Sequence, residues 1–380
     1  MLKLGVIGYG NRINRIVQLL TETGEVTLSA VMDVDIEGAK EKYINPNGFE
    51  NVTFYSDAEE MLKNEKLDGV CIGTRCSLHT HYAMLVAKYN IPLFLEKPVC
   101  ISYEELEKLK TIPHMNDKTV VSFPLRLSNL CMYVKDIIDS GKLGEITHVQ
   151  AYNNVFYGRG YYHLWYRDDS QTGGLFLQKS THDLDYINFL LGDIKPVQVC
   201  AMESKQIYKG NKPAGLKCKD CIDRETCKES DINVAKLKDG RRIGEFCCFA
   251  TDTGNHDSGS IIVKYDNGLH AVYSQNFIVR SGAGKRGARI IGYDATLEFD
   301  WNKSTVTVYS HFDKTTDVKV FAATDGHAGG DELLRDDFLS VMKGEGKSHS
   351  PLADGILSAE MCLAARKSAT ENIFVDIDRG

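Results

Sequence analysis

The sequence predicts two domains: an α/β domain with a doubly wound parallel sheet, followed by a β-rich domain. A length of 380 residues and a hydrophobic content of 43% are enough for two sizeable cores. Through residues 1–122, short apolar runs alternate with segments of helical spacing, which is typical of a parallel sheet. Through residues 123–380, alternating and β-branched runs predominate, interrupted by a cysteine-rich insertion at about 205–250.

The first elements form a strand, a tight turn and a helix. LKLGVIGYG is an apolar run ending in glycines, NRINRIVQLLTET continues at helical spacing, and the next apolar run ends in Asp33. Gly8 and Gly10 would let the backbone approach a pyrophosphate at the helix N-terminus, and Asp33 would accept hydrogen bonds from ribose hydroxyls. Ile13 replaces the third glycine of the common motif, so an ordinary strand-to-helix turn is the alternative. The negative charge of Asp33 would repel a 2'-phosphate, which favours NAD over NADP.

The alternation continues along the first domain. NVTFYS, GVCIGT and PLFLEKPVC read as strands, and DAEEMLKNE and HTHYAMLVAKYN read as helices. Parallel sheets bind ligands at the carboxyl ends of their strands. We therefore expect the cofactor-binding residues to be Gly8, Tyr9, Gly10, Asn11, Arg12, Asp33, Thr74, His79, Glu96 and Lys97.

The second domain contains several segments with strand patterns. ITHVQAYNNVFY, PVQVCAME, GSIIVKYDNGLHAVYSQNFIV, GARIIGYDATLEFDW and STVTVYSHF alternate or are β-branched. YDNG between two apolar runs predicts a hairpin.

The net charge of -7 excludes the basic surface that nucleic acid or an anionic membrane would require, so a small-molecule partner is expected. The N-terminus lacks a signal-peptide pattern, and no apolar stretch is long enough to span a bilayer. We expect a soluble, cytoplasmic protein.

Eleven cysteines are present, and most are scattered through apolar surroundings that indicate reduced packing residues. KCKDCIDRETCKES differs, because it places Cys218, Cys221 and Cys227 in a polar insertion, with Cys247 about 20 residues later. This spacing suggests a structural zinc or iron-sulfur site with those four ligands, and free thiols or a local disulfide are the alternative.

Several motifs together resemble one known family. GYGNR, GTRCSLH, LEKPV, SFPLRLS, SGKLGEI and GGLFLQKSTHDLDYINFLLG follow, over most of the chain, the order found in the Gfo/Idh/MocA family of nicotinamide-dependent sugar and cyclitol oxidoreductases. The resemblance implies an NAD-binding Rossmann domain and a second, α+β domain with a large, mostly antiparallel sheet. It also implies a homo-oligomer, a dimer or a tetramer.

The resemblance implies that Lys97 orients the substrate hydroxyl and shares its proton; a solvated strand-end lysine is the alternative. His182 is the candidate general base, because histidine ordinarily titrates near neutral pH. Ser180 or Thr181 could cap a helix that begins near His182, where Asp185 would share its face. In that case His182 could simply be satisfied by Asp185 or by solvent.

The chain departs from the family just upstream of His182. Many members carry an aspartate where this sequence has Gln178, and an amide can orient a hydroxyl but cannot take its proton. Lys179 is therefore a third catalytic candidate, or else a salt-bridged scaffold residue. The expected substrate residues are Arg126, Tyr157, Arg159, Trp165, Arg167, Gln178 and Asp185. For the aromatic segment around Trp165, a surface loop with an aromatic core plug is the alternative.

The sequence thus predicts NAD-dependent oxidation or reduction of a secondary hydroxyl of a sugar, glycoside or cyclitol. One alternative is a redox-assisted glycosidase that retains its NAD. Another is a non-catalytic sugar- or NAD-sensing protein, which the amide of Gln178 makes conceivable.

Overall fold

The computed structural model describes residues 1–237, 244–322 and 329–378. The chain forms two compact units, one of Met1–Cys131 with Thr324–Glu360 and the other of Met132–Ala323 with Met361–Gly380. The first unit thus includes a C-terminal segment beyond the predicted first domain, residues 1–122, and the domain boundary stays a prediction. In the described segments, no helix is both long and apolar enough to cross a membrane.

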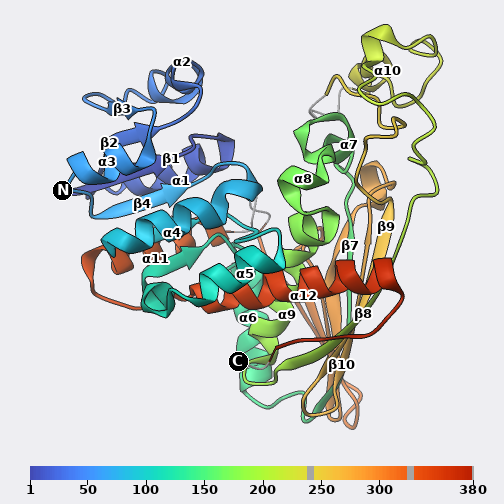
Figure 1. Cartoon of the computed structure of the whole chain (residues 1–380). Helices are drawn as coiled ribbons and strands as arrows, with labels where there is room; N and C mark the ends of the chain where they lie inside the picture. The colour runs from blue at the N-terminus through green and yellow to red at the C-terminus, as the bar shows by residue number, and fades with distance from the viewer. Residues whose placement is uncertain (238–243, 323–328, 379–380) are drawn as a thin grey trace. The chain divides into compact units, whose positions relative to one another are not determined.

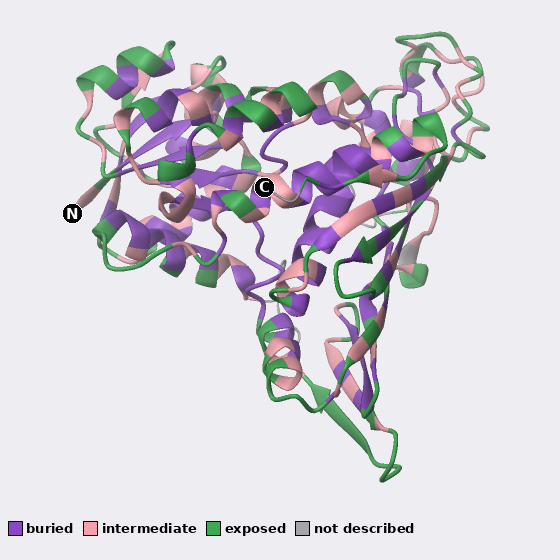
Figure 2. Cartoon of the chain, turned by 60° about the horizontal axis from the view of Figure 1, so that its bottom comes forward, coloured by how far each residue is buried: buried purple, intermediate pink, exposed green. Residues whose placement is uncertain are grey.

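The first unit is built on a six-stranded sheet in the order β3-β2-β1-β4-β5-β6, and each neighbouring pair is parallel (Figure 1). The strands are β1 (Leu2–Ile7), β2 (Val26–Met32), β3 (Thr53–Tyr55), β4 (Gly69–Ile72), β5 (Leu93–Leu95) and β6 (Thr119–Val121). Buried residues dominate the central strands, as expected for a parallel sheet covered on both faces (Figure 2). The predicted doubly wound parallel sheet is confirmed.

Helices connect these strands. They are α1 (Asn11–Glu22), α2 (Ile36–Ala39), α3 (Ala58–Asn64), α4 (His79–Tyr89) and α5 (Tyr103–Lys110), with shorter helical turns at η1 (Lys40–Ile44), η2 (Cys76–Leu78) and η3 (Pro113–Lys118). Helix α11 (Gly330–Lys343) belongs to the C-terminal segment of this unit. The apolar faces of α1 and α11 share one core with β1 and β2. Two of the three boundaries between the units fall within α6 (Asn129–Asp139) and α12 (Leu352–Glu371).

The second unit contains a nine-stranded sheet in the order β14-β13-β12-β11-β7-β10-β9-β8-β15 (Figure 1). The strands are β7 (Ile146–Asn154), β8 (Pro196–Ser204), β9 (Ser258–Tyr265), β10 (His270–Asn276), β11 (Lys285–Gly292), β12 (Ala295–Asp300), β13 (Thr305–Ser310), β14 (Thr316–Val320) and β15 (Val375–Asp376). Among these described strands, β7 and β10 are the parallel pair and the other pairs are antiparallel. The large, mostly antiparallel sheet is confirmed, and YDNG forms the hairpin between β9 and β10.

The helical elements of the second unit are mostly short. They are α7 (Gly160–His163), η4 (Trp165–Arg167), α8 (Asp169–Thr172), η5 (Phe176–Ser180), α9 (Thr181–Leu191), η6 (Cys218–Asp220), α10 (Asp231–Ala235) and η7 (Ser281–Ala283). Helix α9 packs on the sheet. Its Tyr186 ring contacts Trp301 with ring centroids 4.8 Å apart, and its Asn188 accepts a hydrogen bond from Tyr265 of β9 at 3.0 Å.

Candidate active site

The glycine turn after β1 is packed tightly against the loop that follows β4. Gly8 has a φ of +80°, and a Cβ there would lie 2.6 Å from Thr74 Cγ2. A Cβ on Gly73 would lie 2.0 Å from Ile13 Cγ1. Gly10 precedes α1 without a side-chain cap, so the first N–H groups of α1 donate no hydrogen bond to a capping side chain. This backbone fits a pyrophosphate, which binds well at a helix N-terminus.

Asp33 lies at the end of β2, beside this turn. Its Oδ2 accepts a hydrogen bond from the Tyr9 backbone N–H at 2.6 Å, and its Oδ1 accepts from the Asp35 N–H at 2.8 Å. The carboxylate is thus held in one orientation next to the glycine turn, as a ribose-binding acceptor requires. The Tyr9 ring is instead buried against Tyr43, and Asn11 Oδ1 accepts a hydrogen bond from the Tyr43 hydroxyl at 2.7 Å.

Arg12 and Glu96, both expected to bind the cofactor, form an ion pair with each other. Arg12 Nε lies 3.2 Å from Glu96 Oε1, and Arg12 Nη2 lies 2.6 Å from Asp331 of α11. Burial acts to lower the pKa of the guanidinium, but the two carboxylates outweigh it and raise the pKa. The two ion pairs of Arg12 therefore tie α1 to the end of β5 and to α11. Contact of Arg12 and Glu96 with the cofactor stays a prediction.

His79 connects the two loops that carry Thr74 and Lys97. The imidazole is buried, with Nδ1 2.7 Å from the Pro98 carbonyl and Nε2 3.2 Å from the Thr74 carbonyl. Burial lowers the pKa of His79 below its ordinary value, which favours the neutral ring. His79 thus holds together the strand-end loops after β4 and β5, and half-buried Lys97 lies on the second of these loops.

The Arg126 side chain is buried within the first unit and is not exposed to solvent. Its Nη1 donates to Asp354 Oδ2 at 2.6 Å and to the His349 carbonyl at 3.1 Å. This ion pair gives Arg126 a structural function, and its contact with substrate stays a prediction.

The KSTHDLD segment of the second unit is continuous helix. A π-helical turn over Phe176–Ser180 leads directly into α9, and the Ser180 hydroxyl donates to Gln275 Oε1 at 3.0 Å across the sheet. Helix α9 begins at Thr181, near His182 as expected, but the Ser180 side chain makes no capping hydrogen bond. The side chains of Gln178, Lys179 and His182 are all buried, and π-helical turns of this kind frequently occur at functional sites. Asp185 is also buried on α9.

Asp183 is a central residue of this segment that sequence reasoning missed. Its fully buried carboxylate accepts hydrogen bonds from Arg286 Nε at 2.8 Å, Asn153 Nδ2 at 2.9 Å and the Tyr273 hydroxyl at 2.9 Å. Strand register places Arg286 of β11 opposite Asn153 of β7, and Asn153 opposite Gln275 of β10. A row of polar side chains therefore crosses three strands beneath α9.

The row continues toward β8. Gln275 Nε2 lies 2.8 Å from His256 Nε2, and His256 Nδ1 lies 2.7 Å from Glu203 Oε2. The sequence did contain a signal for this row of polar side chains. Polar residues occupy inward-facing positions of β10 and β11, and a buried polar side chain needs a partner.

Lys179 contacts Tyr157. Its ammonium donates a short hydrogen bond to the Tyr157 hydroxyl and lies 4.6 Å from the centroid of that ring. The Tyr157 ring is 42% exposed, whereas Lys179 is 5% exposed. Burial of the hydroxyl acts to raise the pKa of Tyr157, but Lys179 and Arg286 outweigh this effect and lower it.

The aromatic segment before α8 has two parts. Tyr162 is fully buried and donates to the His256 carbonyl at 2.6 Å, as expected of a core plug. Trp165 is half-buried and stacks on Tyr166 with ring centroids 4.0 Å apart. A stacked, partly accessible pair of this kind can contact the apolar face of a sugar.

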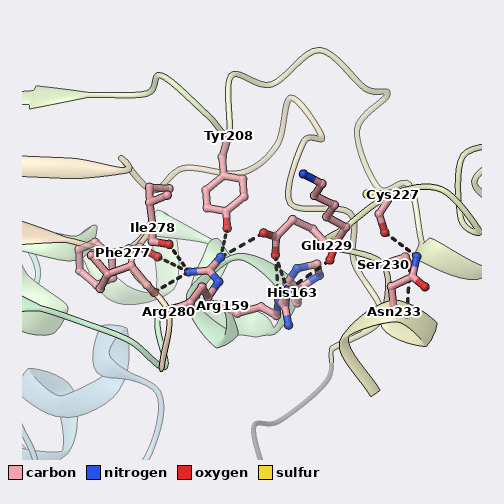
Figure 3. Close-up of polar contacts among 12 residues, drawn as sticks. Arg159, His163, Tyr208, Cys227, Glu229, Ser230, Asn233, Phe277, Ile278 and Arg280 are labelled. Atoms are coloured by element: carbon pink, nitrogen blue, oxygen red, sulfur yellow. Dashed lines mark hydrogen bonds and ion pairs between the residues drawn. The ribbon is translucent and has the colours of Figure 1, made fainter. Parts of the chain in front are cut away.

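Arg159 and Arg167 hold the insertion onto this segment. Arg159 Nε donates to Glu229 Oε2 at 2.8 Å, and Arg167 Nη2 lies 2.5 Å from Asp252 Oδ1. Figure 3 shows Glu229 between Arg159 and Arg280, whose Nη2 also donates to the Tyr208 hydroxyl at 2.7 Å. Both predicted substrate arginines thus have ion-pair partners in the insertion, and their contact with substrate stays a prediction.

The predicted cysteine metal site is not supported. In residues 1–237, 244–322 and 329–378, no group of three or more His, Cys, Asp or Glu side chains is arranged to hold a metal. Cys218, Cys221, Cys227 and Cys247 are free thiols, so a local disulfide is not formed either. Burial raises the pKa of Cys218 and of Cys247, which favours the neutral thiol. The ion pairs of Figure 3 and the aromatic cluster around Tyr208 tie down the insertion instead.

The fold and the glycine turn define a dinucleotide-binding oxidoreductase. A family model described as the NAD-binding Rossmann fold of the oxidoreductase family matches residues 2–123, and one for its C-terminal alpha/beta domain matches residues 135–377. The chain belongs to the Gfo/Idh/MocA oxidoreductase family. It is an oxidoreductase with an NAD-binding Rossmann domain.

Relatives and solved structures agree with this assignment. The chain is 25% identical to YteT of Bacillus subtilis (strain 168), over 75% of each chain. It is 28% identical to the inositol 2-dehydrogenase of Rhizobium meliloti (strain 1021), over 56% of this chain and 62% of that relative. A levoglucosan dehydrogenase in complex with NADH has the same fold, with a TM-score of 0.79 and 17% identity over 99% of both chains.

Proposed function

We propose that the protein transfers hydride between NAD and a secondary hydroxyl of a sugar, glycoside or cyclitol, and that Lys97 and His182 handle the hydroxyl proton. The observation that carries the proposal is the construction of the first unit. The glycine turn packs on Thr74, and His79 joins Thr74 to the loop of Lys97. One rigid edge of the sheet thus bears both the proposed cofactor turn and the proposed catalytic lysine.

The chain's own residues would divide the work as follows. NAD, when bound, supplies the hydride acceptor. The Lys97 ammonium would donate a hydrogen bond to the substrate oxygen and stabilise its negative charge as the proton leaves. The His182 imidazole would accept that proton, since histidine ordinarily titrates near neutral pH. Asp185 and Gln178, buried on the same helical segment, would orient the sugar hydroxyls.

NAD is proposed rather than NADP because of Asp33. Its carboxylate is fixed by two backbone N–H groups beside the glycine turn. In that position it accepts hydrogen bonds from a ribose diol and repels a phosphate.

Tyr157 and Trp165 are the proposed aromatic walls for the sugar. Arg126, Arg159 and Arg167 are retained as proposed substrate contacts, although all three are already ion-paired. The same proposal includes a cytoplasmic location and a homo-oligomer, a dimer or a tetramer.

The test is incubation of the purified protein with NAD and a panel of sugars, cyclitols and glycosides. Formation of NADH with at least one of them supports a dehydrogenase. Glycosidic cleavage without net NADH supports the redox-assisted glycosidase. Binding of NAD and sugar without either product supports the non-catalytic sensor and overturns the proposal.

The redox-assisted glycosidase is retained as the second candidate because of one observation. Transient oxidation followed by bond cleavage needs a second proton-handling group besides the one that serves the hydroxyl. Tyr157, hydrogen-bonded to Lys179, is such a group in the same unit as His182.

A further inference from the structure

Tyr157 and Lys179 form an unusual pair in the second unit. The ammonium of Lys179 is almost fully buried, and its hydrogen bond goes to a phenol. Lys179 lies on the π-helical turn three residues before His182, whereas Tyr157 lies in the loop after β7 and exposes 42% of its surface. The pair therefore joins a buried positive charge, three residues before the proposed base, to a tyrosine that is partly exposed but whose hydroxyl is buried.

The charges around the Tyr157 hydroxyl favour its ionised form. Lys179 on η5 and Arg286 on β11 are positive, and Asp183 on α9 is negative. Lys179 also lies 6.0 Å from the ring centroid of Tyr161. Two cations and one carboxylate leave an excess positive charge, which a phenolate would neutralise.

Arg286, one of these two cations, also has an unsatisfied hydrogen-bond donor. Its Nε is bonded to Asp183, but its Nη2 is buried without a hydrogen-bond partner among the described residues. A buried guanidinium N–H normally has an acceptor. An anionic substrate oxygen bound beside Tyr157 would provide one.

We infer that Tyr157 and Lys179 form a second acid–base pair of the substrate site, which takes a proton from the carbon beside the oxidised hydroxyl. The inference rests on the proposed function, because the neighbouring C–H becomes acidic only after the hydroxyl carbon has become a carbonyl. The C–H proton moves to the phenolate oxygen, and its electron pair passes to the carbonyl oxygen as an enolate. Return of the proton regenerates the phenolate and the ketone.

Tyrosine suits this step better than histidine does. Removal of a proton from carbon requires a stronger base than removal from a hydroxyl, and the ordinary pKa of tyrosine is about 10 against about 6.5 for histidine. Lys179 keeps this stronger base ionised at lower pH. His182 would therefore accept the hydroxyl proton, and Tyr157 would accept the proton from the neighbouring carbon. With a leaving group on the next carbon, the enolate expels it, so the pair extends the chemistry from oxidation to cleavage of a glycoside.

The first experiment measures the ionisation of Tyr157 without any substrate. The absorbance of tyrosinate is titrated in the wild type, in Tyr157→Phe and in the matched control Tyr293→Phe, which removes an exposed tyrosine. The difference between the wild-type curve and each variant's curve gives the ionisation of the replaced tyrosine. Tyr157 should ionise at a lower pH than Tyr293. Lys179→Met should abolish the early ionisation, and Lys179→Arg should largely retain it. Coincident curves for the two tyrosine variants would overturn the inference.

The second experiment follows the proton on carbon. The protein is incubated in heavy water with NAD and a glycoside from the panel that yields NADH, and deuterium in the recovered glycoside is located by NMR. We expect deuterium on the carbon beside the oxidised one. Tyr157→Phe should slow this exchange by about 100-fold or more, and by more than it slows NADH formation.

The two proposals fail separately in these experiments. If no member of the panel yields NADH or cleavage, the proposed function fails, and the tyrosinate titration still judges the pair. If NADH forms but no deuterium enters the glycoside, or if Tyr157→Phe slows both reactions equally, the second acid–base pair is refuted while the dehydrogenase stands.

Discussion

Asp183 and Arg286 form a buried ion pair that joins α9 to β11, with Arg286 Nε 2.8 Å from Asp183 Oδ1. Asp183 is fully buried and is also bound by Asn153 and Tyr273. Asp183 lies in the same segment as Lys179 and His182, so the ion pair holds that segment on the sheet.

Asp183→Asn should strongly destabilise the second unit. The amide leaves the Arg286 charge buried without a counter-charge, which costs about 3–5 kcal/mol in unfolding free energy. Both tryptophans, Trp165 and Trp301, belong to this unit, so urea unfolding followed by tryptophan fluorescence reports on it. Asp193→Asn, at an exposed position just after α9, is the matched control. Equal loss of stability in both variants would contradict the importance of the buried pair.

His163 should make the second unit less stable in acid. Burial lowers its pKa to about 4, although a hydrogen bond between Nδ1 and the Phe246 carbonyl opposes the shift. The unfolded chain has the ordinary value of about 6.5, so its histidine binds a proton first as the pH falls. The contribution of neutral His163 to the unfolding free energy is therefore fully present above about pH 6.5 and is lost as the pH falls toward 4.

The variant His163→Gln removes that titration. Between about pH 7 and about pH 5, its unfolding free energy should fall by about 2 kcal/mol less than that of the wild type. His270→Gln changes an exposed histidine of the same unit and should leave the pH dependence of the wild type. Parallel pH profiles for the wild type and His163→Gln would show that His163 does not contribute.

Asp33→Asn should weaken discrimination between the two nicotinamide cofactors. Loss of the charged acceptor should lower NADH affinity by about 10-fold and remove the repulsion of a 2'-phosphate. The ratio of NADPH to NADH affinity, measured by fluorescence titration, should therefore rise by at least that factor. Glu37→Gln, an exposed change nearby on α2, is the control. An unchanged ratio would remove Asp33 from cofactor selection.

The elements of the fold could be predicted because their periodicity is local. Apolar runs alternating with helical segments are sufficient to predict the parallel sheet of the first unit. YDNG is sufficient to predict the hairpin between β9 and β10 in the second unit. The π-helical turn at Phe176–Ser180 could not be predicted, because its polar residues also match a capped helix start.

The partners of the site residues were harder to predict. Asp183 and Arg286 are 103 positions apart, and Arg12 and Asp331 are 319 apart. Their pairing depends on strand register and on the return of a C-terminal helix to the first unit. Motif spacing alone was enough to place Asp33 beside the glycine turn, because both lie within one strand-helix-strand unit.

The central claim is that Lys97 acts on the substrate hydroxyl beside bound NAD. The most direct test compares Lys97→Met with the wild type, measuring NAD affinity by calorimetry and NADH formation with a glycoside that the wild type oxidises. Our account predicts nearly unchanged NAD affinity and a loss of NADH formation of about 100-fold or more. NADH formation at the wild-type rate would contradict it.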